Sequence, residues 1–269
     1  MISRWFRSVA IAWSGLPRGL RWVLLLAAVL HGVGLSWGLP SSDAWDNDGI
    51  APRDILPGLA ATFTPGDHYT YPPLQLAILA VLTLPVTVLA AVRAGSSHVP
   101  VVIGEILKPP YMTTFTITAR IVTFLMSLGI ILAIAAIAAE TAPRERRARV
   151  STFAALFATV NWSFSYYAHT SNLDVPYLFW AWLAVLALVR AIVRHEPRRL
   201  RAFAVLAALA VATKDQAYAM FLLGAPAAFV AWAALVPAAR ADLRRLLREA
   251  LIGLLIALGV LLLLSLIHI

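Results

Sequence analysis

The chain has no cysteine and few charged residues. Only 13% of its 269 residues are charged, whereas 61% are hydrophobic and the mean hydropathy is +0.82. Soluble domains carry about 25% charged residues, so this composition excludes a soluble globular protein. The absence of cysteine excludes disulfides, thiolate metal sites and cysteine nucleophiles. The sequence also lacks a Walker loop, GxGxxG, HExxH and GxSxG, so nucleotide-driven pumping and metalloprotease chemistry have no support.

Seventeen of the 22 basic residues fall into four clusters, each beside an apolar run. The clusters are Arg4, Arg7, Arg18 and Arg21; Arg144, Arg146, Arg147 and Arg149; Arg190, Arg194, Arg198, Arg199 and Arg201; and Arg240, Arg244, Arg245 and Arg248. Short basic loops between membrane spans remain in the cytoplasm. The pattern therefore predicts a multi-pass protein of the inner (plasma) membrane, with a cytoplasmic N-terminus, membrane lipids around it and no nucleic-acid partner.

Apolar stretches between these clusters predict an all-α, polytopic transmembrane helical bundle with about seven spans. The expected spans are residues 22–37, 120–139, 152–167, 175–193, 203–212, 218–236 and 250 onward. We expect residues 1–269 to form a single transmembrane domain. Because the chain stops inside an apolar run, LLLLSLIHI, without a closing charge, we also expect it to be truncated at its C-terminal end.

Residues 39–119 are expected to form an outer loop with juxtamembrane helices. Within it, residues 74–92 are apolar and long enough to span, but a span there would place the basic RERRAR run on the outside. We therefore expect this stretch to lie on, or dip into, the outer face, where Pro85 interrupts the helical hydrogen bonds. The alternative is a second short span around residues 99–116, in which Glu105 and Lys108 make insertion costly.

The candidate catalytic acids lie in the first outer loop, which holds five of the eight aspartates. These are Asp43, Asp46, Asp48, Asp54 and Asp67. Carboxylates at the water–lipid boundary can act as general bases or bind a cation, although solvated loop caps would have the same composition. Asp174 follows in the next outer turn, where it could cap the helix that begins at Val175, belong to the site, or do both. Asp46, Asp48 and Asp174 could also bind a divalent cation, but nothing in the sequence requires one.

Two cations are expected at the outer ends of spans. Arg120 begins one span, and Lys214 lies in the turn ATKDQAYA. A cation at this depth is costly and usually has a partner, and a lipid phosphate would accept charge-assisted hydrogen bonds from it. The alternatives are snorkelling to the interface and, for Lys214, a local pair with Asp215. We interpret His31, Asn161 and Trp162 as packing residues.

The order of these features resembles the GT-C membrane glycosyltransferases, in particular the dolichyl-phosphate-mannose–protein mannosyltransferase and aminoarabinose transferase group. The resemblance covers residues 20–225. It rests on an acidic outer loop ending in YPPL, then TARIVTFLMSLG with a basic inner turn, NLDVPYLFW and ATK. It implies a polyprenyl-phosphate-linked sugar as donor, a protein, lipid or glycan as acceptor, and an inverting displacement with an outer-loop carboxylate as base.

The resemblance also implies roles for individual residues. The family's catalytic acid is usually part of an Asp-Glu pair, and this chain has DND at that place, so Asp48 is the first candidate and Asp46 the second. Asp174 matches the family's second outer-loop acid. The positions of Arg120 and Lys214 suit the donor phosphate, and Tyr71 lies in the juxtamembrane YPPL segment. All four are expected to bind substrate.

Two other classes of function remain open. A transporter or lipid flippase would place ionisable residues near mid-bilayer on helices broken by glycine or proline, often in repeated halves. Here the ionisable residues gather at the outer ends and no repeated halves are evident, which favours the enzyme. A membrane scaffold without catalytic activity would leave the five aspartates of the first outer loop unexplained.

Overall fold

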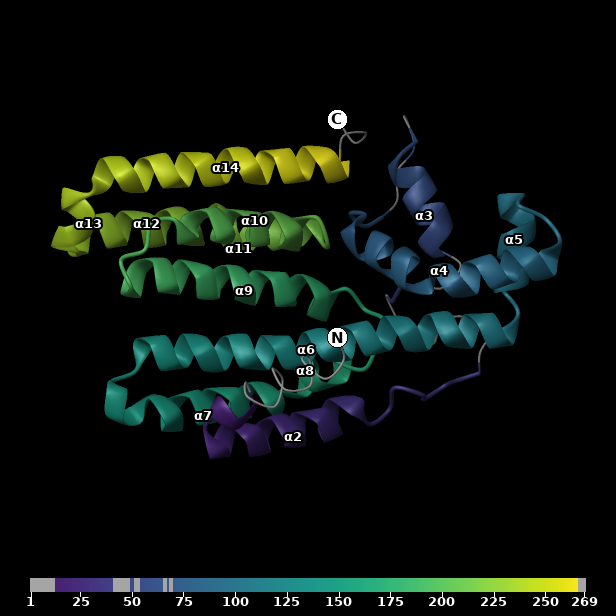
Figure 1. The fold of residues 1–269 in the computed structure, drawn as a ribbon, viewed down its shortest axis with the longest axis horizontal. Coiled ribbons are helices and arrows are strands. Elements are labelled where there is room, and N and C mark those ends of the chain that lie inside the picture. Colours follow the sequence, from purple (N-terminus) through teal and green to yellow (C-terminus); the bar gives the residue numbers. More distant parts are fainter. Residues whose placement is uncertain (1–12, 41–48, 51–53, 65–66, 68–69, 266–269) are drawn as a thin grey trace.

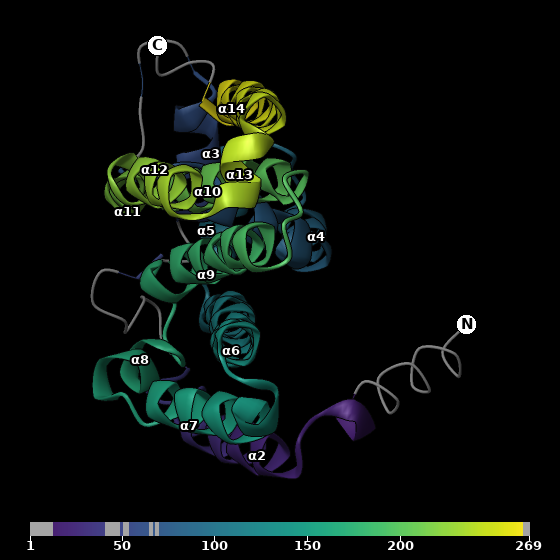
Figure 2. The same cartoon turned by 90° about the vertical axis from the view of Figure 1, so that its left-hand side faces the viewer.

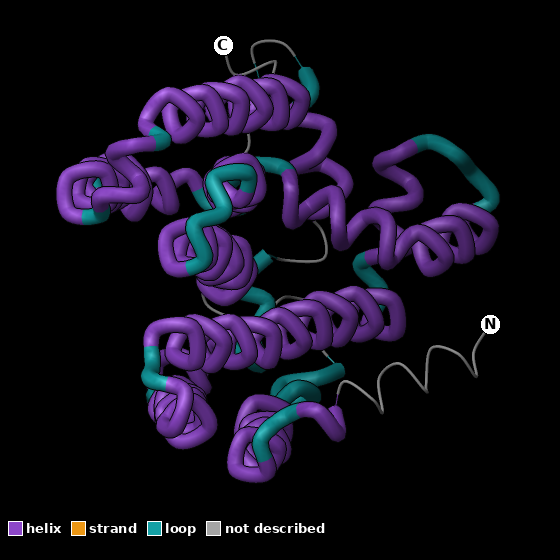
Figure 3. The backbone as a smooth tube through the Cα atoms, turned by 60° about the vertical axis from the view of Figure 1, so that its left-hand side comes forward, coloured by secondary structure: helices purple, strands orange, loops and turns teal. Residues whose placement is uncertain are grey.

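The computed structural model describes residues 13–40, 49–50, 54–64, 67 and 70–265, and within these ranges its regular elements are all helices (Figures 1 and 3). An isolated bridge between Gly49 and Asn172 is the single β-type pairing recorded there. The expected all-α class is confirmed. The α-helices are α2 (Arg18–Gly32), α3 (Ile55–Thr62), α4 (Leu74–Ala94), α5 (Val99–Ile106), α6 (Pro109–Thr141), α7 (Arg147–Thr159), α8 (Trp162–Tyr167), α9 (Asp174–Val193), α10 (Arg199–Val211), α11 (Tyr218–Leu222), α12 (Gly224–Leu235), α13 (Pro237–Ala241) and α14 (Leu243–Ser265).

The helices stack in the order α2, α7, α6, α9, α10 and α14, each in contact with the next (Figure 2). The α6–α7 turn, the α9–α10 turn and α13 lie at one end of this stack, at the left of Figure 1. Three of the four basic clusters lie at or beside these turns, so we call this the arginine-rich end. The opposite end, which we call the α4 end, carries α3, α4 and α5 beside the projecting half of α6 (Figure 1).

Ion pairs tie the helices together at the arginine-rich end. Glu140 of α6 accepts a hydrogen bond from Arg190 Nε of α9 at 2.9 Å and also pairs with Arg194. Glu249 of α14 is buried and accepts from Arg201 Nε of α10 at 2.6 Å. Because a carboxylate withdrawn from water needs a cationic partner, these pairs fix how α6 aligns with α9 and how α10 aligns with α14.

Among the residues that the structure describes, five segments are long and apolar enough to cross a membrane, so the prediction of about seven spans is wrong in number. They are α4, α6, α9, residues Asp215–Leu235 and α14. The expected spans in α2, α7 and α10 fail on length: helices of 15, 13 and 13 residues reach about 20–22 Å, against about 30 Å of hydrocarbon. Large apolar side chains are exposed along these long helices, for example Val81 on α4 and Leu263 on α14. Such a surface fits a protein embedded in a membrane.

Two of the short helices, α2 and α7, end close to residues that redirect the backbone. Helix α2 stops at Gly32, and the positive φ angles of Gly34 (+99°) and Gly38 (+75°) turn the chain out of the helix. The expected span over residues 152–167 breaks at Asn161, whose side chain accepts a hydrogen bond from the Phe164 backbone N–H and caps α8. Asn161 was expected to be a packing residue and is instead a helix cap.

Helix α4 is continuous over 21 residues and passes through Pro85 without a break. The proline therefore does not end the helix, and α4 is itself one of the five segments long enough to span. Its first residue, Leu74, donates a backbone hydrogen bond to Ala212 O, just after α10, at 3.0 Å. Helix α4 thus begins where α10 ends. It lies past the ends of α9 and α10 that are opposite the arginine-rich end (Figures 1 and 3). Its expected position on the outer face of the membrane stays a prediction.

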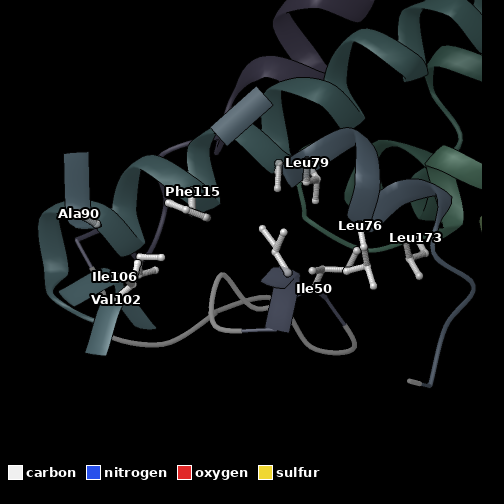
Figure 4. Packing of buried hydrophobic residues seen from close by; sticks show 10 residues of the cluster. Ile50, Leu76, Leu79, Ala90, Val102, Ile106, Phe115 and Leu173 are labelled. Atoms are coloured by element: carbon white, nitrogen blue, oxygen red, sulfur yellow. The ribbon is translucent and has the colours of Figure 1, made fainter. Parts of the chain in front are cut away.

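An apolar cluster holds the α4 end together (Figure 4). It joins residues of α4, α5 and α6 with Ile50, which lies before α3, and with Leu173, which precedes α9. Phe115 of α6 and Leu76 of α4 are among its fully buried members. This burial brings residues 49–50 against the start of α9.

Candidate functional site

The candidate site is built on an ion pair between Asp174 and Lys214 at the α4 end of α9 and α10. Lys214 Nζ donates to Asp174 Oδ1 at 2.5 Å, and the two side chains are 15% and 28% exposed, respectively. The sequence left a local pair of Lys214 with Asp215 open. In the structure the Asp215 carboxylate instead accepts from the Gln216 backbone N–H at 2.8 Å.

Local backbone geometry leaves the Asp174 carboxylate available to Lys214. Asp174 is the first residue of α9, and the residue at the N-cap position is Leu173. The Asp174 backbone N–H donates to Asn172 Oδ1 at 2.8 Å, so Asn172 satisfies it. Of the alternatives that the sequence left open, the one in which Asp174 itself caps the helix is wrong. A carboxylate in the first helical turn is favoured by the helix dipole, and the side chain can bind a cation at the same time.

Two tyrosines, Tyr71 and Tyr177, interact with the Lys214 ammonium group. Its nitrogen lies 5.7 Å from the ring centroid of Tyr177, one turn along α9 from Asp174, a geometry typical of a cation–π contact. Burial acts to lower the pKa of Lys214, but the hydrogen bond and charge of Asp174, with contributions from Tyr71 and Tyr177, raise it above its ordinary value. Lys214 is therefore a cation at all physiological pH values. Of the expected site residues, Tyr71, Asp174 and Lys214 thus belong to one environment.

Residues 49 and 50 lie beside the turn that precedes Asp174. The Ile50 backbone N–H donates to Ser171 O at 3.3 Å, and Gly49 pairs with Asn172, two residues before Asp174. Asp48 precedes Gly49 in the sequence. Asp46 and Asp48 themselves lie outside the described residues, so their catalytic role stays a prediction.

Arg120 donates hydrogen bonds to the segment that follows α2. It is 1% exposed, and its Nη1 donates to the backbone carbonyls of Leu35 at 2.9 Å and Trp37 at 2.8 Å, just after α2. The sequence predicts a lipid phosphate as its ligand, and that role stays a prediction. Its backbone partners could not be foreseen, because they lie 83 and 85 residues away in the chain.

An apolar cavity of about 610 Å³ opens between α10, α11, α12 and α14. Phe203, Ala207, Phe221, Phe229, Leu254 and Leu261 are among the side chains that line it. Val211 and Tyr218, on either side of Lys214 in the sequence, also line the cavity. The cavity therefore extends along α10 and α14 toward Val211 and Tyr218, the lining residues nearest to Lys214 in the sequence. No sequence signal marked it, because its lining resembles any other apolar helix face.

Two expected packing residues differ in their surroundings. His31 is fully buried between α2, α6 and α7, where Nδ1 lies 3.0 Å from Ser127 Oγ and Nε2 lies 3.2 Å from Thr159 O. This agrees with the packing role expected for it. Trp162, in contrast, is 81% exposed at the start of α8, so the expectation that it packs inside the protein is wrong.

Within the described ranges, no group of three or more His, Cys, Asp or Glu side chains is arranged to hold a metal ion. Comparisons with protein families, curated proteins and solved structures found no match for this chain. Function is therefore argued from the site itself.

Proposed function

We propose that this chain is a polyprenyl-phosphate-sugar-dependent glycosyltransferase of the GT-C type, which acts at the outer face of the membrane. The observation that carries the proposal is the meeting of Lys214, Asp174, Tyr177 and Tyr71 at the end of the stack opposite the arginine-rich end. Basic turns mark the cytoplasmic side, so this cluster faces outward. It combines a fixed cation, a carboxylate and two hydroxyl-bearing rings at one place.

The cluster and the cavity suit the two parts of such a donor. An ammonium group has three N–H donors, so Lys214 can bind a phosphate oxygen while it remains paired with Asp174. The apolar cavity continues from the residues that flank Lys214 into the hydrophobic region of the stack, and it suits a hydrocarbon chain. Pockets for lipid-sized or drug-sized ligands typically have about 300–1,000 Å³, which includes the volume of this cavity.

In the proposed reaction, an Asp48 or Asp46 carboxylate takes the proton from an acceptor hydroxyl on a protein, lipid or glycan. The acceptor oxygen attacks the anomeric carbon from the face opposite the phosphate. The bond between that carbon and the phosphate oxygen breaks, and polyprenyl phosphate leaves with the electron pair. The configuration at the anomeric carbon is inverted. Lys214 stabilises the charge on the departing phosphate.

The test is sugar transfer from polyprenyl-phosphate donors by the purified protein reconstituted in lipid. We expect Asp48→Asn to lower turnover by about 10²–10⁴-fold, the usual contribution of a general base, while the thermal unfolding midpoint is retained. Asp215→Asn is the matched control, because Asp215 lies beside Lys214 but outside its ion pair. Loss of turnover in Asp46→Asn alone would move the base to Asp46. A folded protein that turns over none of the donors would refute the transferase and favour the transporter or flippase.

A further inference from the structure

Helix α6 presents a polar face to the end of α2. Arg120, Thr123 and Ser127 are all buried, and their spacing of three and then four residues places them on one side of the helix. Ser127 contacts His31 in the last turn of α2, and Arg120 contacts the backbone just beyond it. The end of α2 is therefore held at two levels along α6.

The backbone that Arg120 holds is a run of turns outside any helix. Residues 33–38 form successive turns after α2, with Gly34 and Gly38 at positive φ. Glycine loses more conformational freedom on folding than any other residue, so such a segment needs anchors outside itself. Arg120 Nη1 supplies one by donating to two of its carbonyls, those of Leu35 and Trp37.

The same segment packs directly on the turn that leads to Asp174. The Trp37 ring lies edge-on to the His169 ring, with centroids 6.0 Å apart. A Cβ atom at Gly34 would lie only 3.2 Å from His169 Cδ2, which shows how closely the Gly34 backbone approaches the His169 ring. From His169 the chain continues within three residues to Asn172, which pairs with Gly49 and satisfies the backbone N–H of Asp174.

We infer that Arg120 is a positioning residue: it holds the Leu35 and Trp37 carbonyls, seats Trp37 on His169, and so places the Asn172–Asp174 turn and the Gly49 segment against each other. The geometric part of this inference stands without an assigned reaction. Its catalytic consequence rests on the proposed function. Arg120 then acts on the site through the backbone, at a distance from the donor phosphate.

The experiment exploits the absence of native cysteine. Gly49 and Asn172 lie opposite each other in an antiparallel bridge, where Cα atoms are about 4.5–5.5 Å apart, within the range a disulfide needs. We expect the Gly49→Cys, Asn172→Cys pair to cross-link readily in membranes. The yield is expected to fall at least fivefold when Arg120→Gln is added and less when Arg120→Lys is added. Arg147→Gln is the matched control, because Arg147 Nε also donates to a backbone carbonyl but at the arginine-rich end.

A second cysteine pair reports on folding. Ala204→Cys and Gly253→Cys join α10 to α14, where a Cβ atom at Gly253 would lie 3.1 Å from Ala204 Cβ. An unchanged Gly49–Asn172 yield in Arg120→Gln overturns the inference. If Arg120→Gln lowers the yield of both cysteine pairs, Trp37→Ala is tested in its place. A loss of yield in Trp37→Ala that is confined to the Gly49–Asn172 pair supports the inference. An unchanged Gly49–Asn172 yield in Trp37→Ala overturns it.

Kinetics separates positioning from phosphate binding. In the transferase assay, Arg120→Gln is expected to lower kcat at least tenfold with little change in the donor KM. A rise in the donor KM with kcat unchanged would make Arg120 a phosphate ligand and overturn the positioning role. Because cross-linking needs no substrate, failure of the transferase assay leaves the geometric test intact.

Discussion

The Asp174–Lys214 ion pair gives the sharpest quantitative prediction. Exposed ion pairs contribute about 0–1 kcal/mol, whereas a hydrogen bond to a charged group contributes about 1.5–3 kcal/mol. At 2.5 Å, with both side chains largely withdrawn from solvent, this pair belongs nearer the second range. We therefore expect a coupling free energy of about 2 kcal/mol in a double-mutant cycle of Asp174→Asn and Lys214→Met.

The two single variants should differ in stability. In Lys214→Met, the Asp174 carboxylate still lies in the first turn of α9, where the helix dipole contributes about 0.3–1 kcal/mol. In Asp174→Asn, Lys214 retains the ring of Tyr177 at 5.7 Å, but its ammonium group is withdrawn from water without a carboxylate. Asp174→Asn should therefore be the more destabilising of the two.

Thermal unfolding followed by intrinsic fluorescence suits this measurement, because the chain has nine tryptophans. One kcal/mol corresponds to about 2–4 °C in Tm for chains of about 150–250 residues, so the coupling should appear as roughly 4–8 °C of non-additivity. Asp215→Asn serves as the control and should change Tm little. Additive Tm shifts in the double variant would refute the ion pair as a stabilising interaction.

Two further predictions concern packing inside the stack and use the same fluorescence assay. His31→Leu should lower stability by about 1–2 kcal/mol, because it removes two buried hydrogen bonds, one of them with Ser127; a higher Tm in this variant would contradict that role. Gly129→Leu should cost about 1–3 kcal/mol by overpacking, since even a Cβ atom there would lie 2.5 Å from the Phe179 ring of α9. Its matched control is Gly259→Leu on α14, where a Cβ atom meets nothing within 4 Å; equal Tm losses in the two glycine variants would rule out the α6–α9 contact as the cause.

The helical class and the arginine-rich end could be predicted from the sequence, because both follow from local composition. Apolar runs have no stable alternative to helices in a membrane, and the arginine clusters fall at the turns between them. Helix lengths were harder to predict, because the hydropathy of a segment does not indicate where its helix ends. The windows around Gly34 and Asn161 remain apolar enough to resemble spans, yet a positive φ angle and a helix cap end the helices there.

The partners of the site residues could not be predicted from the sequence, because they depend on how the helices pack. Lys214 has Asp215 next to it in the chain but pairs with Asp174, 40 residues earlier. That choice depends on the close packing of α9 against α10, which fully buried alanines such as Ala181 and Ala210 permit. Arg120 was expected to begin a span, but α6 begins at Pro109. The hydrogen bonds of Arg120 depend on the path of the chain after α2, which glycine leaves open.

The length of α6 explains why a buried arginine is tolerated where Arg120 lies. Its 33 residues extend about 50 Å, some 20 Å more than the hydrocarbon core of a bilayer. If the end at Thr141 lies at the cytoplasmic boundary, as the positive-inside pattern predicts, the opposite boundary crosses α6 near Arg120. Asp174 begins the 20-residue helix α9, about 30 Å from the arginine-rich end, and in that orientation it lies at the same level. With the proposed orientation, Arg120 and the Asp174–Lys214 pair would both lie at the boundary between lipid and water, where a lipid-borne phosphate and a water-borne acceptor can meet.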